Sequence, residues 1–384
     1  MKQVRKLSEI CNIFSGSRPK GGAISSGVLS IGGEHISSDG YFDLSNPKYI
    51  PEGYFKNLKR GILKPGDVLL VKDGATTGKV GFFGNEAPFA EGAVNEHVFV
   101  LRANDFEIIK PKYICYFLKS ETGNNAILKR KVGSAQGGIN LSIGDIGVVL
   151  PTLSEQQEIV SILEEIDDLR QKQRKAIELT RQMIPALFYE MFGDIHNPIC
   201  KLTTLAEAVL ISGKKMNPQD QLTSTFYYIG LENIESGTGK VVGSTLHTGS
   251  GIKSLKNVFG VGDVLYGKLR PYLNKVCLPG SQGICSTDIL VLKPRNLICT
   301  PEFLCATLQN SYFVEQASAQ MQGANLPRIS AESLLQIPII LPPFSHQQQF
   351  TLKFTEIHSL IAQQEQSIQK LDVLFETTLN QFFS

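Results

Sequence analysis

A glycine-rich segment, DGATTGKV at residues 73–80, comes closer to a chemical motif than any other part of the chain. The phosphate-binding loop of nucleotide hydrolases needs four residues between its glycines and a Ser or Thr after its Lys. Here three residues separate Gly74 from Gly78, and Val80 follows Lys79. The segment therefore does not predict nucleotide hydrolysis, although its amides, hydroxyls and Lys could contact a phosphodiester. An enzyme that uses this loop remains an alternative, and in that case Lys79→Ala should abolish nucleotide turnover by the isolated chain.

Three further polar segments, at residues 129–140, 268–275 and 320–328, carry side chains suited to nucleic acid. Gln and Asn can pair with adenine, Lys and Arg can pair with guanine or contact phosphate, and Gly allows close backbone approach. Solvated hairpins and plain turns would have a similar composition, so both interpretations stay open. The candidate DNA-contacting residues are Lys72, Thr76, Thr77, Lys79, Lys129, Arg130, Lys131, Gln136, Asn140, Lys214, Lys215, Lys268, Arg270, Tyr272, Asn274, Lys275, Gln322, Asn325 and Arg328.

No other group of residues has the spacing of a catalytic or metal site. The six histidines and seven cysteines show no zinc-ligand spacing. The sequence has no Gly-x-Ser-x-Gly turn and no dinucleotide-binding glycine pattern. The odd number of scattered cysteines favours reduced thiols in a cytoplasm. We expect no catalytic residues, no cofactor and no metal, and no apolar run approaches the ~18 residues of a membrane span.

The elements that must position these loops occur twice along the chain. LPTLSEQQ begins at Leu150, and LPPFSHQQ begins about 190 residues later at Leu341. Each half also contains a Gly-Asp-Val sequence, at residues 66–68 and 262–264, and a Pro-aromatic-Cys segment, at 111–119 and 301–309. We expect the former to begin buried strands and the latter to be helices. Repetition on this scale predicts two similar domains.

The charge is divided between the globular and helical parts. Residues 1–150 contain 19 Lys and Arg against 14 Asp and Glu, and residues 196–344 contain 12 against 9. Residues 151–195 contain 5 against 9, and residues 345–384 contain 2 against 4. Two basic globular parts fit a polyanionic partner, although this excess also falls within the range of ordinary proteins.

Two long helices are predicted after the repeated Leu-Pro sequences. Ser154-x-x-Gln157 and Ser345-x-x-Gln348 have the pattern of capping boxes, and Gly193 stands where a C-terminal cap belongs. Apolar residues then recur at spacings of three and four, which is typical of a coiled coil. Pro185 should kink or end the first helix. Antiparallel pairing of two helices ~55 Å long would relate the halves by an approximate two-fold axis. The polar seam residues Gln173 and Gln364 could fix the register of such a pair, or could lie at solvated positions.

The duplicated order of Gly-Asp-Val, a polar Gly/Asn stretch, Leu-Pro, Ser-x-Gln-Gln and a long helix resembles the specificity subunits of type I restriction-modification enzymes. Leu150-Pro151 with residues 154–157 matches that family's Leu-Pro-x-x-x-Glu-Gln junction, whereas the second copy has His346 in place of Glu. The resemblance covers essentially the whole chain. It implies an α+β fold with two target-recognition domains, at 1–150 and 194–343, separated by antiparallel coiled-coil helices at 151–193 and 344–384.

The resemblance also implies the function. Each domain would recognise one half of a split site in double-stranded DNA, and the subunit would have no catalytic activity. Its partners would be two methyltransferase subunits and two restriction subunits, to which the methyl donor and ATP would belong. A different class of function remains as an alternative, namely a non-catalytic coiled-coil scaffold with two protein- or sugar-binding domains.

Overall fold

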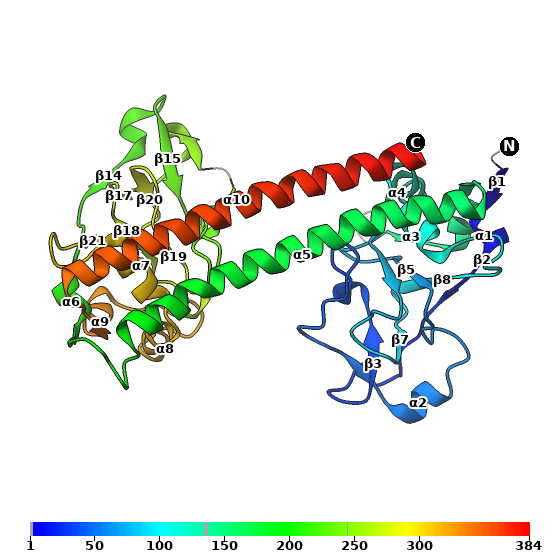
Figure 1. Ribbon diagram of the computed structural model, residues 1–384, viewed down its shortest axis with the longest axis horizontal. Helices are drawn as coiled ribbons and strands as arrows, with labels where there is room; N and C mark the ends of the chain where they lie inside the picture. The colour runs from blue at the N-terminus through cyan, green and yellow to red at the C-terminus, as the bar shows by residue number, and fades with distance from the viewer. Residues whose placement is uncertain (1–2, 134–136, 244) are drawn as a thin grey trace. The chain divides into compact units, whose positions relative to one another are not determined.

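The computed structural model describes residues 3–133, 137–243 and 245–384 and divides into two compact units. Unit 1 consists of residues 1–172 and 367–384, and unit 2 of residues 173–366. Both units combine sheets with helices, so the predicted α+β class is confirmed (Figure 1). Among the described residues, no helix is long and apolar enough to cross a membrane.

Unit 1 is built around a four-stranded sheet with the strand order β2-β8-β5-β6. A second sheet has the order β4-β3-β7, and the pairs β1-β11 and β9-β10 complete the strands. The elements that begin in this unit are β1 Gln3–Lys6, α1 Leu7–Ile10, β2 Cys11–Ser15, β3 Val28–Ile31, η1 Gly33–His35, β4 Tyr49–Ile50, α2 Glu52–Lys56, β5 Asp67–Val71, β6 Val80–Phe83, β7 Gly92–Val94, β8 Val98–Ala103, α3 Pro111–Lys119, α4 Glu121–Leu128, β9 Lys131–Val132, β10 Gly138–Ile139, η2 Leu141–Asp145, β11 Gly147–Leu150 and α5 Leu153–Phe192.

Unit 2 has a four-stranded sheet with the order β13-β21-β18-β19, a five-stranded sheet with the order β14-β17-β20-β15-β16, and the pair β12-β22. The elements that begin in this unit are β12 Leu202–Thr204, α6 Leu205–Ala208, β13 Val209–Ile211, β14 Lys215–Met216, η3 Pro218–Gln221, β15 Thr225–Ile229, η4 Leu231–Asn233, β16 Leu246–Thr248, η5 Gly249–Gly251, β17 Lys256–Phe259, β18 Val264–Gly267, η6 Pro271–Leu273, β19 Val276–Cys277, β20 Gly283–Cys285, β21 Ile289–Pro294, α7 Pro301–Gln309, α8 Ser311–Ala319, α9 Ala331–Leu335, β22 Pro338–Ile340 and α10 Phe344–Phe383.

Strand β5 of unit 1 is buried on both faces. Val68 and Leu70 join the core beneath α3 and α5, while Leu69 and Val71 join the core beneath the second sheet. Asp67, at the start of the strand, is fully buried, and Arg102 of β8 donates to both of its carboxylate oxygens at 2.7 Å. This paired charge keeps the buried carboxylate satisfied where the strand enters the core.

Strand β18 of unit 2 has the same arrangement. Val264 and Tyr266 face one core and Leu265 faces the other. Asp263 accepts a hydrogen bond from the Gly260 amide at 2.7 Å and lies 3.4 Å from the Lys293 ammonium. The Gly-Asp-Val sequences therefore begin buried strands, as predicted. The structure adds that both strands are buried on both faces and that their Asp side chains anchor the preceding turns.

The expected capping boxes are wrong in detail. Helix α5 begins one residue before Ser154, and the reciprocal hydrogen bonds join Thr152 to Glu155: the Thr152 amide donates to the Glu155 carboxylate at 2.8 Å, and the Glu155 amide donates to the Thr152 hydroxyl at 3.3 Å. In α10 the equivalent positions hold Pro343 and His346, which have no such pair among the described contacts. Pro has no amide hydrogen to donate, so the second helix begins without a box.

The first Gln of each repeated Ser-x-Gln-Gln junction is fully buried instead. The Gln156 side chain accepts from the Lys110 amide at 2.9 Å and donates to the Ile108 and Pro151 carbonyls at 3.0 Å. Gln347 accepts from the Thr300 amide at 3.0 Å and donates to the Ile298 and Pro342 carbonyls at 2.8 and 2.9 Å. One side-chain amide thus joins the start of each long helix to the loop before α3 or α7.

The predicted seam is largely buried within each unit. In unit 1, Arg170 of α5 is buried. Its Nη1 donates to the carboxylate of Asp167, on the same helix, at 2.8 Å, and its Nε donates to the carboxylate of Asp372, on α10, at 2.7 Å. In unit 2, Gln173 donates to the Gln364 carbonyl at 3.2 Å, so the two polar seam residues do meet. Phe188 near the end of α5 contacts Phe350 near the start of α10, which makes the helix segments of unit 2 antiparallel.

The first long helix continues through Pro185 to Phe192, so of the two outcomes predicted for Pro185, the end of the helix there is wrong and a kink stays a prediction. Gly193 follows with φ +74°, and its amide donates to the Tyr189 carbonyl, which confirms the predicted C-terminal cap. Helices α3 and α7 have the bounds expected from the sequence.

We expect Gln347→Leu to lower the free energy of unfolding by about 2–4 kcal/mol, because it leaves an amide and two carbonyls without their partner. Denaturant unfolding of the full chain, followed by circular dichroism, measures this. Gln348→Leu is the matched control, since Gln348 is exposed, and it should change stability by less than about 0.5 kcal/mol. Equal effects of the two substitutions would contradict the role of the buried amide.

Candidate nucleic-acid interface

Two of the candidate segments of unit 1 lie together. The loop after β5 (residues 72–79) and the described residues before η2 (137–140) are joined by the Ile139 amide, which donates to the Lys72 carbonyl at 2.7 Å. The Lys72 amide in turn donates to the His97 carbonyl at 2.9 Å. We call these segments the first loop pair. The two joined residues, Lys72 and Ile139, are 67 positions apart in the chain (139 − 72), yet the fold brings them side by side.

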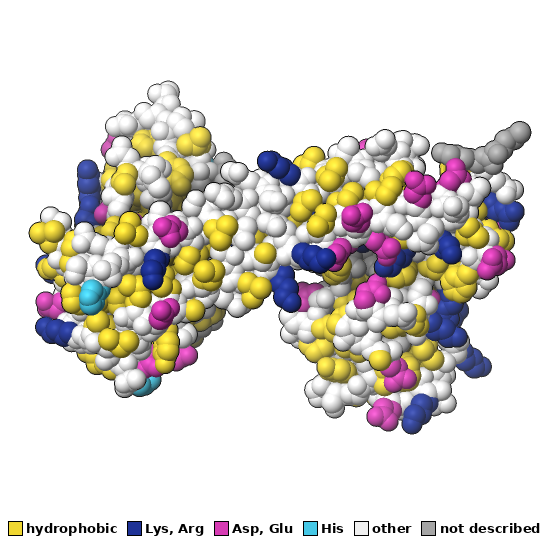
Figure 2. All heavy atoms as spheres, in the orientation of Figure 1, with side chains coloured by type: hydrophobic (Ala, Val, Ile, Leu, Met, Phe, Trp, Pro, Cys, Tyr) yellow, Lys and Arg dark blue, Asp and Glu magenta, His cyan; other side chains and the backbone are white. Residues whose placement is uncertain are grey.

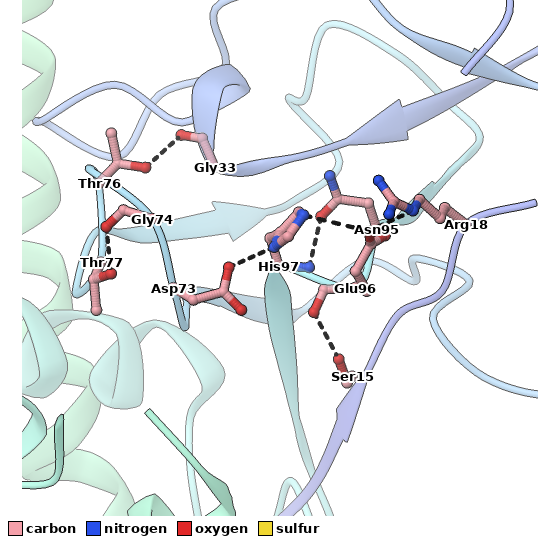
Figure 3. A network of polar contacts seen from close by, with 10 residues as sticks. All are labelled: Ser15, Arg18, Gly33, Asp73, Gly74, Thr76, Thr77, Asn95, Glu96 and His97. Atoms are coloured by element: carbon pink, nitrogen blue, oxygen red, sulfur yellow. Dashed lines mark hydrogen bonds and ion pairs between the residues drawn. The ribbon is translucent and has the colours of Figure 1, made fainter. Parts of the chain in front are cut away.

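A network of charged side chains borders the first loop pair (Figure 3). His97, just before β8, donates through Nδ1 to the Asp73 carboxylate, and its Nε2 lies 3.3 Å from Glu96. Glu96 is paired with exposed Arg18 at 2.8 Å. Figure 3 shows the Asp73 and His97 side chains pointing toward each other from the loop and the strand.

The same backbone contacts join the candidate segments of unit 2, residues 268–275 and 322–328. The Ile329 amide donates to the Lys268 carbonyl at 3.1 Å, and the Lys268 amide donates to the Asp288 carbonyl at 3.0 Å. The Arg270 amide donates to the Pro327 carbonyl at 2.8 Å. We call these segments the second loop pair. Arg328 pairs through Nε with Asp288 at 3.2 Å.

Two residues of the second loop pair have a left-handed backbone. Arg270 has φ 51° and Asn274 has φ 48°, on either side of η6. This conformation costs roughly 1 kcal/mol or more for a residue with a side chain. Asn274 is held by a hydrogen bond from its side chain to the Gln309 carbonyl at 3.0 Å. Arg270 and Tyr272 are exposed, and no contact of the Arg270 guanidinium is found among the described residues.

Other candidates use their polar groups inside the protein. The Lys79 ammonium donates to the Ile36 carbonyl at 3.1 Å, and Lys275 donates to the Leu231 and Ile234 carbonyls at 2.6 and 2.9 Å. Arg130 donates to the Ser142 and Ala126 carbonyls at 2.9 and 2.8 Å. These cations hold the loops in place, so a role of their charged groups in contacting DNA stays a prediction.

The remaining candidates differ in exposure. Thr76 and Thr77 donate to the Gly33 and Gly74 carbonyls at 3.3 and 2.6 Å, and Asn140 accepts from the Ser142 amide at 2.8 Å. Gln136 lies outside the described residues. The exposed candidates are Lys129, Lys131, Asn140, Lys214, Lys215, Arg270, Tyr272, Gln322 and Asn325.

Lys214 and Lys215 lie apart from the loop pairs in the chain fold, at β14 of the five-stranded sheet, where Met216 is opposite Lys256. Lys256 was not singled out by its sequence, yet it is only 8% exposed and its ammonium donates to the Ser254 hydroxyl at 2.5 Å. No carboxylate contacts it among the described residues, and burial lowers the pKa of its ammonium. An anion placed at this edge would stabilise the charge.

The sequence also gave no signal for His97 and Asp288. Each precedes a long strand, β8 or β21, and becomes a neighbour of a candidate loop only through sheet pairing. No cluster of His, Cys, Asp and Glu that could hold a metal ion occurs in the described part of the chain.

The long helices expose hydrophobic side chains in both units, as Figure 2 shows for the visible side. The most exposed of them include Leu169, Leu179, Met183, Leu352, Leu360, Val373 and Leu374. Exposed apolar positions on a charged helical surface are typical of a protein-docking face.

Comparisons with known proteins agree on one family. Residues 2–179 match the family model described as the type I restriction modification DNA specificity domain. The chain is 30% identical over 147 residues to the type I restriction enzyme EcoDI specificity subunit of Escherichia coli, which is 38% of this chain and 32% of that subunit. This match therefore spans about a third of that relative's length.

Two longer matches extend the likeness. The chain is 24% identical over 362 residues to the type I restriction enzyme MjaVIII specificity subunit of Methanocaldococcus jannaschii, covering 84% of this chain and 80% of that one. The solved S subunit of a type I restriction-modification system from M. genitalium has a TM-score of 0.58 at 14% identity, covering 100% of this chain and 96% of that chain. At this identity the structural likeness establishes the fold.

The left-handed backbone at Arg270 predicts a difference in stability between two substitutions at this position. Arg270→Gly should be about 1 kcal/mol more stable than Arg270→Ala, because only Gly adopts φ 51° without steric strain. Thermal or denaturant unfolding of the two variants measures the difference. A more stable Ala variant would mean that this turn relaxes when the Arg side chain is removed.

Proposed function

Because this chain is similar to the specificity subunits of type I restriction-modification enzymes, we propose that it is a member of that family, recognises a split site in double-stranded DNA and recruits methyltransferase subunits to it. The observation that carries the proposal is the recurrence of one loop arrangement in both units, each beside a doubly buried strand. Members of this family are not enzymes, and the chain needs no cofactor of its own for this role.

Each loop pair would contact one half of the site. Exposed lysines such as Lys129 and Lys131 suit phosphate contacts, which position a protein on the duplex without selecting sequence. Arg270, Gln322 and Asn325 are exposed side chains that can hydrogen-bond to base edges in the major groove. The five-stranded sheet carries a second set of cations, at Lys214, Lys215 and Lys256. They could contact the DNA phosphates of the half-site that unit 2 recognises.

The long helices would set the spacing between the half-sites and bind the partner subunits. Residues 1–150 and 194–343 would act as target-recognition domains, with antiparallel coiled-coil helices at 151–193 and 344–384 and an approximate two-fold relation between the halves. The exposed apolar residues of α5 and α10, together with their acidic balance, favour contacts with protein over contacts with DNA. Two methyltransferase subunits, and in the complete enzyme two restriction subunits, would assemble on the DNA-bound chain.

A scaffold whose domains bind proteins or sugars is the second candidate, favoured by the small net charge of +2. The two functions differ in their response to salt. Contacts with DNA phosphates release counterions, so affinity falls steeply as salt rises, whereas binding of a neutral sugar is almost independent of salt.

We expect the assembled methylating complex to protect two short DNA segments whose centres lie about one helical turn, ~10 bp, apart. The base pairs between the two segments should not be selected. Footprinting combined with mutation of each protected base pair measures this. A single continuous motif in which every position matters would contradict the split-site proposal.

Lys131→Gln should weaken binding to all DNA sequences equally and should reduce the slope of log affinity against log salt by about 1, because one phosphate contact is lost. Fluorescence anisotropy at several salt concentrations gives both quantities. Lys131 lies in β9, opposite Ile139 of the first loop pair. Lys59→Gln, an exposed lysine of the same unit outside both the loop pair and β9, is the control and should leave the slope unchanged. If both substitutions have the same effect, only the net charge of the unit matters.

A further inference from the structure

The two loop pairs have the same backbone geometry but opposite side-chain chemistry at one shared place. The amide of Lys72 or Lys268 donates to the carbonyl of His97 or Asp288, and this makes His97 and Asp288 equivalent positions. Both also hydrogen-bond through their amides to the side chain two residues earlier, Asn95 at 2.9 Å or Ser286 at 3.3 Å. The match therefore does not depend on sequence identity.

His97 and Asp288 form ion pairs with different loops of their loop pairs: His97 with residues 72–79, and Asp288 with residues 322–328. In unit 1, the carboxylate belongs to the loop, at Asp73, and the strand supplies the imidazole of His97. In unit 2, the loop supplies the guanidinium of Arg328, and the strand supplies the carboxylate of Asp288. The residue equivalent to Asp73 is Leu269, which forms a bridge with Arg328, and the residue equivalent to Arg328 is Gly138.

Each loop residue keeps hydrogen-bonding capacity beyond its ion pair. Asp73 uses Oδ1 toward His97, and no contact of its Oδ2 is found among the described residues. Arg328 uses Nε toward Asp288 and Nη1 toward the Leu326 carbonyl at 3.3 Å, and its Nη2 has no contact in the described part of the chain. The side chains of Asp73 and Arg328 are 32% and 41% exposed, so both side chains are partly open to a ligand.

DNA phosphates repel a carboxylate in a loop that approaches them, so such a carboxylate is favourable only if it makes a compensating contact with a base. An ionised carboxylate only accepts hydrogen bonds, and among base edges in the major groove the donors are the amino groups of cytosine and adenine. A guanidinium only donates, and guanine offers two acceptors, O6 and N7. Gly138 has no side chain, which leaves the space beside Asp73 open; a Cβ there would lie 3.2 Å from the Asp73 Cβ.

We propose that Asp73 recognises the amino group of a cytosine or adenine in one half-site and that Arg328 recognises a guanine in the other. His97 and Asp288 are positioning residues that orient these two side chains. This inference rests on the proposed function and assigns a base chemistry to each loop pair.

The test is selection of sequences from a randomised DNA duplex by the full-length chain, compared with Asp73→Leu. We expect the parent to prefer cytosine or adenine at one position of one half-site. In the Leu variant, the preference for cytosine or adenine over the other bases at this position should fall by a factor of at least about five. Its affinity for non-specific DNA should not fall, since a charge that repels phosphate has been removed. A residue with a merely structural role would not separate these two readouts.

Further variants distinguish the bases and the role of His97. Asp73→Asn should keep a preference for adenine, whose N6 and N7 an amide can pair with, but should lose a preference for cytosine. His97→Leu should weaken selection at the same position as Asp73→Leu and at no other. Arg328→Gln should weaken selection for guanine in the opposite half-site only. Glu107→Gln is the matched control, because Glu107 is an exposed acid of unit 1 outside the loop pair.

Unchanged selection in Asp73→Leu, or the same change in Glu107→Gln, would overturn the assignment while leaving the proposed function intact. A loss of affinity for all DNA together with a lowered unfolding temperature would also overturn it, since Asp73 would then be structural. A parent chain that selects no sequence would contradict the proposed function and this inference with it.

Discussion

The attachment of each long helix to its globular body depends on one buried side-chain amide, that of Gln156 or Gln347. Each amide accepts one hydrogen bond and donates two, and all of its partners are backbone groups. Glutamate could not replace it, because a carboxylate cannot donate and would carry an unpaired charge into the core. The amide joins two segments by their backbones, so it fixes the direction in which the helix leaves the body whatever side chains surround it.

A second constraint is the burial of β5 and β18 on both faces. A strand covered on both sides can carry polar side chains only at its ends, and at the start this place is taken by Asp67 or Asp263. The loops that follow the strands are then the nearest places where charged residues reach solvent. Backbone hydrogen bonds from Ile139 or Ile329 bring a second loop to the same place, and these bonds do not restrict side-chain identity. Such a framework allows the two units to present different chemistry on the same support.

The lysines and arginines near these loops form two groups: one hydrogen-bonds to backbone carbonyls of the protein, and the other is exposed to solvent. Lys79 and Lys275 donate to backbone carbonyls around η1 and η4, and Arg130 donates to the carbonyls of α4 and η2. They stabilise the loops from within. Lys129, Lys131, Arg270 and the free edge of Arg328 face outward and remain available to an anionic partner. The positive balance of each globular part therefore overstates the charge that a ligand meets.

The sequence by itself determined the elements whose pattern is local. The bounds of α3 and α7, the strands after Gly-Asp-Val, the long amphipathic helices and the Gly193 cap all follow from residues within a few turns of one another. Even there, two overlapping patterns were indistinguishable: Ser154-x-x-Gln157 looks like a capping box, but Thr152-x-x-Glu155 forms it. Both satisfy the same local rule, so local sequence does not decide between them.

Only the tertiary structure decided which polar residues are committed to the protein and which remain for a partner. Gln156 belongs to the repeated junction at the start of a helix, yet two of its hydrogen-bond partners lie 46 and 48 residues earlier in the chain. The sequence shows only that Lys79 could contact a phosphodiester, whereas in the fold its ammonium also donates to the Ile36 carbonyl, and His97 meets Asp73 across a sheet. A side chain's hydrogen-bonding partners are set by distances in space, and the sequence gives only distances along the chain.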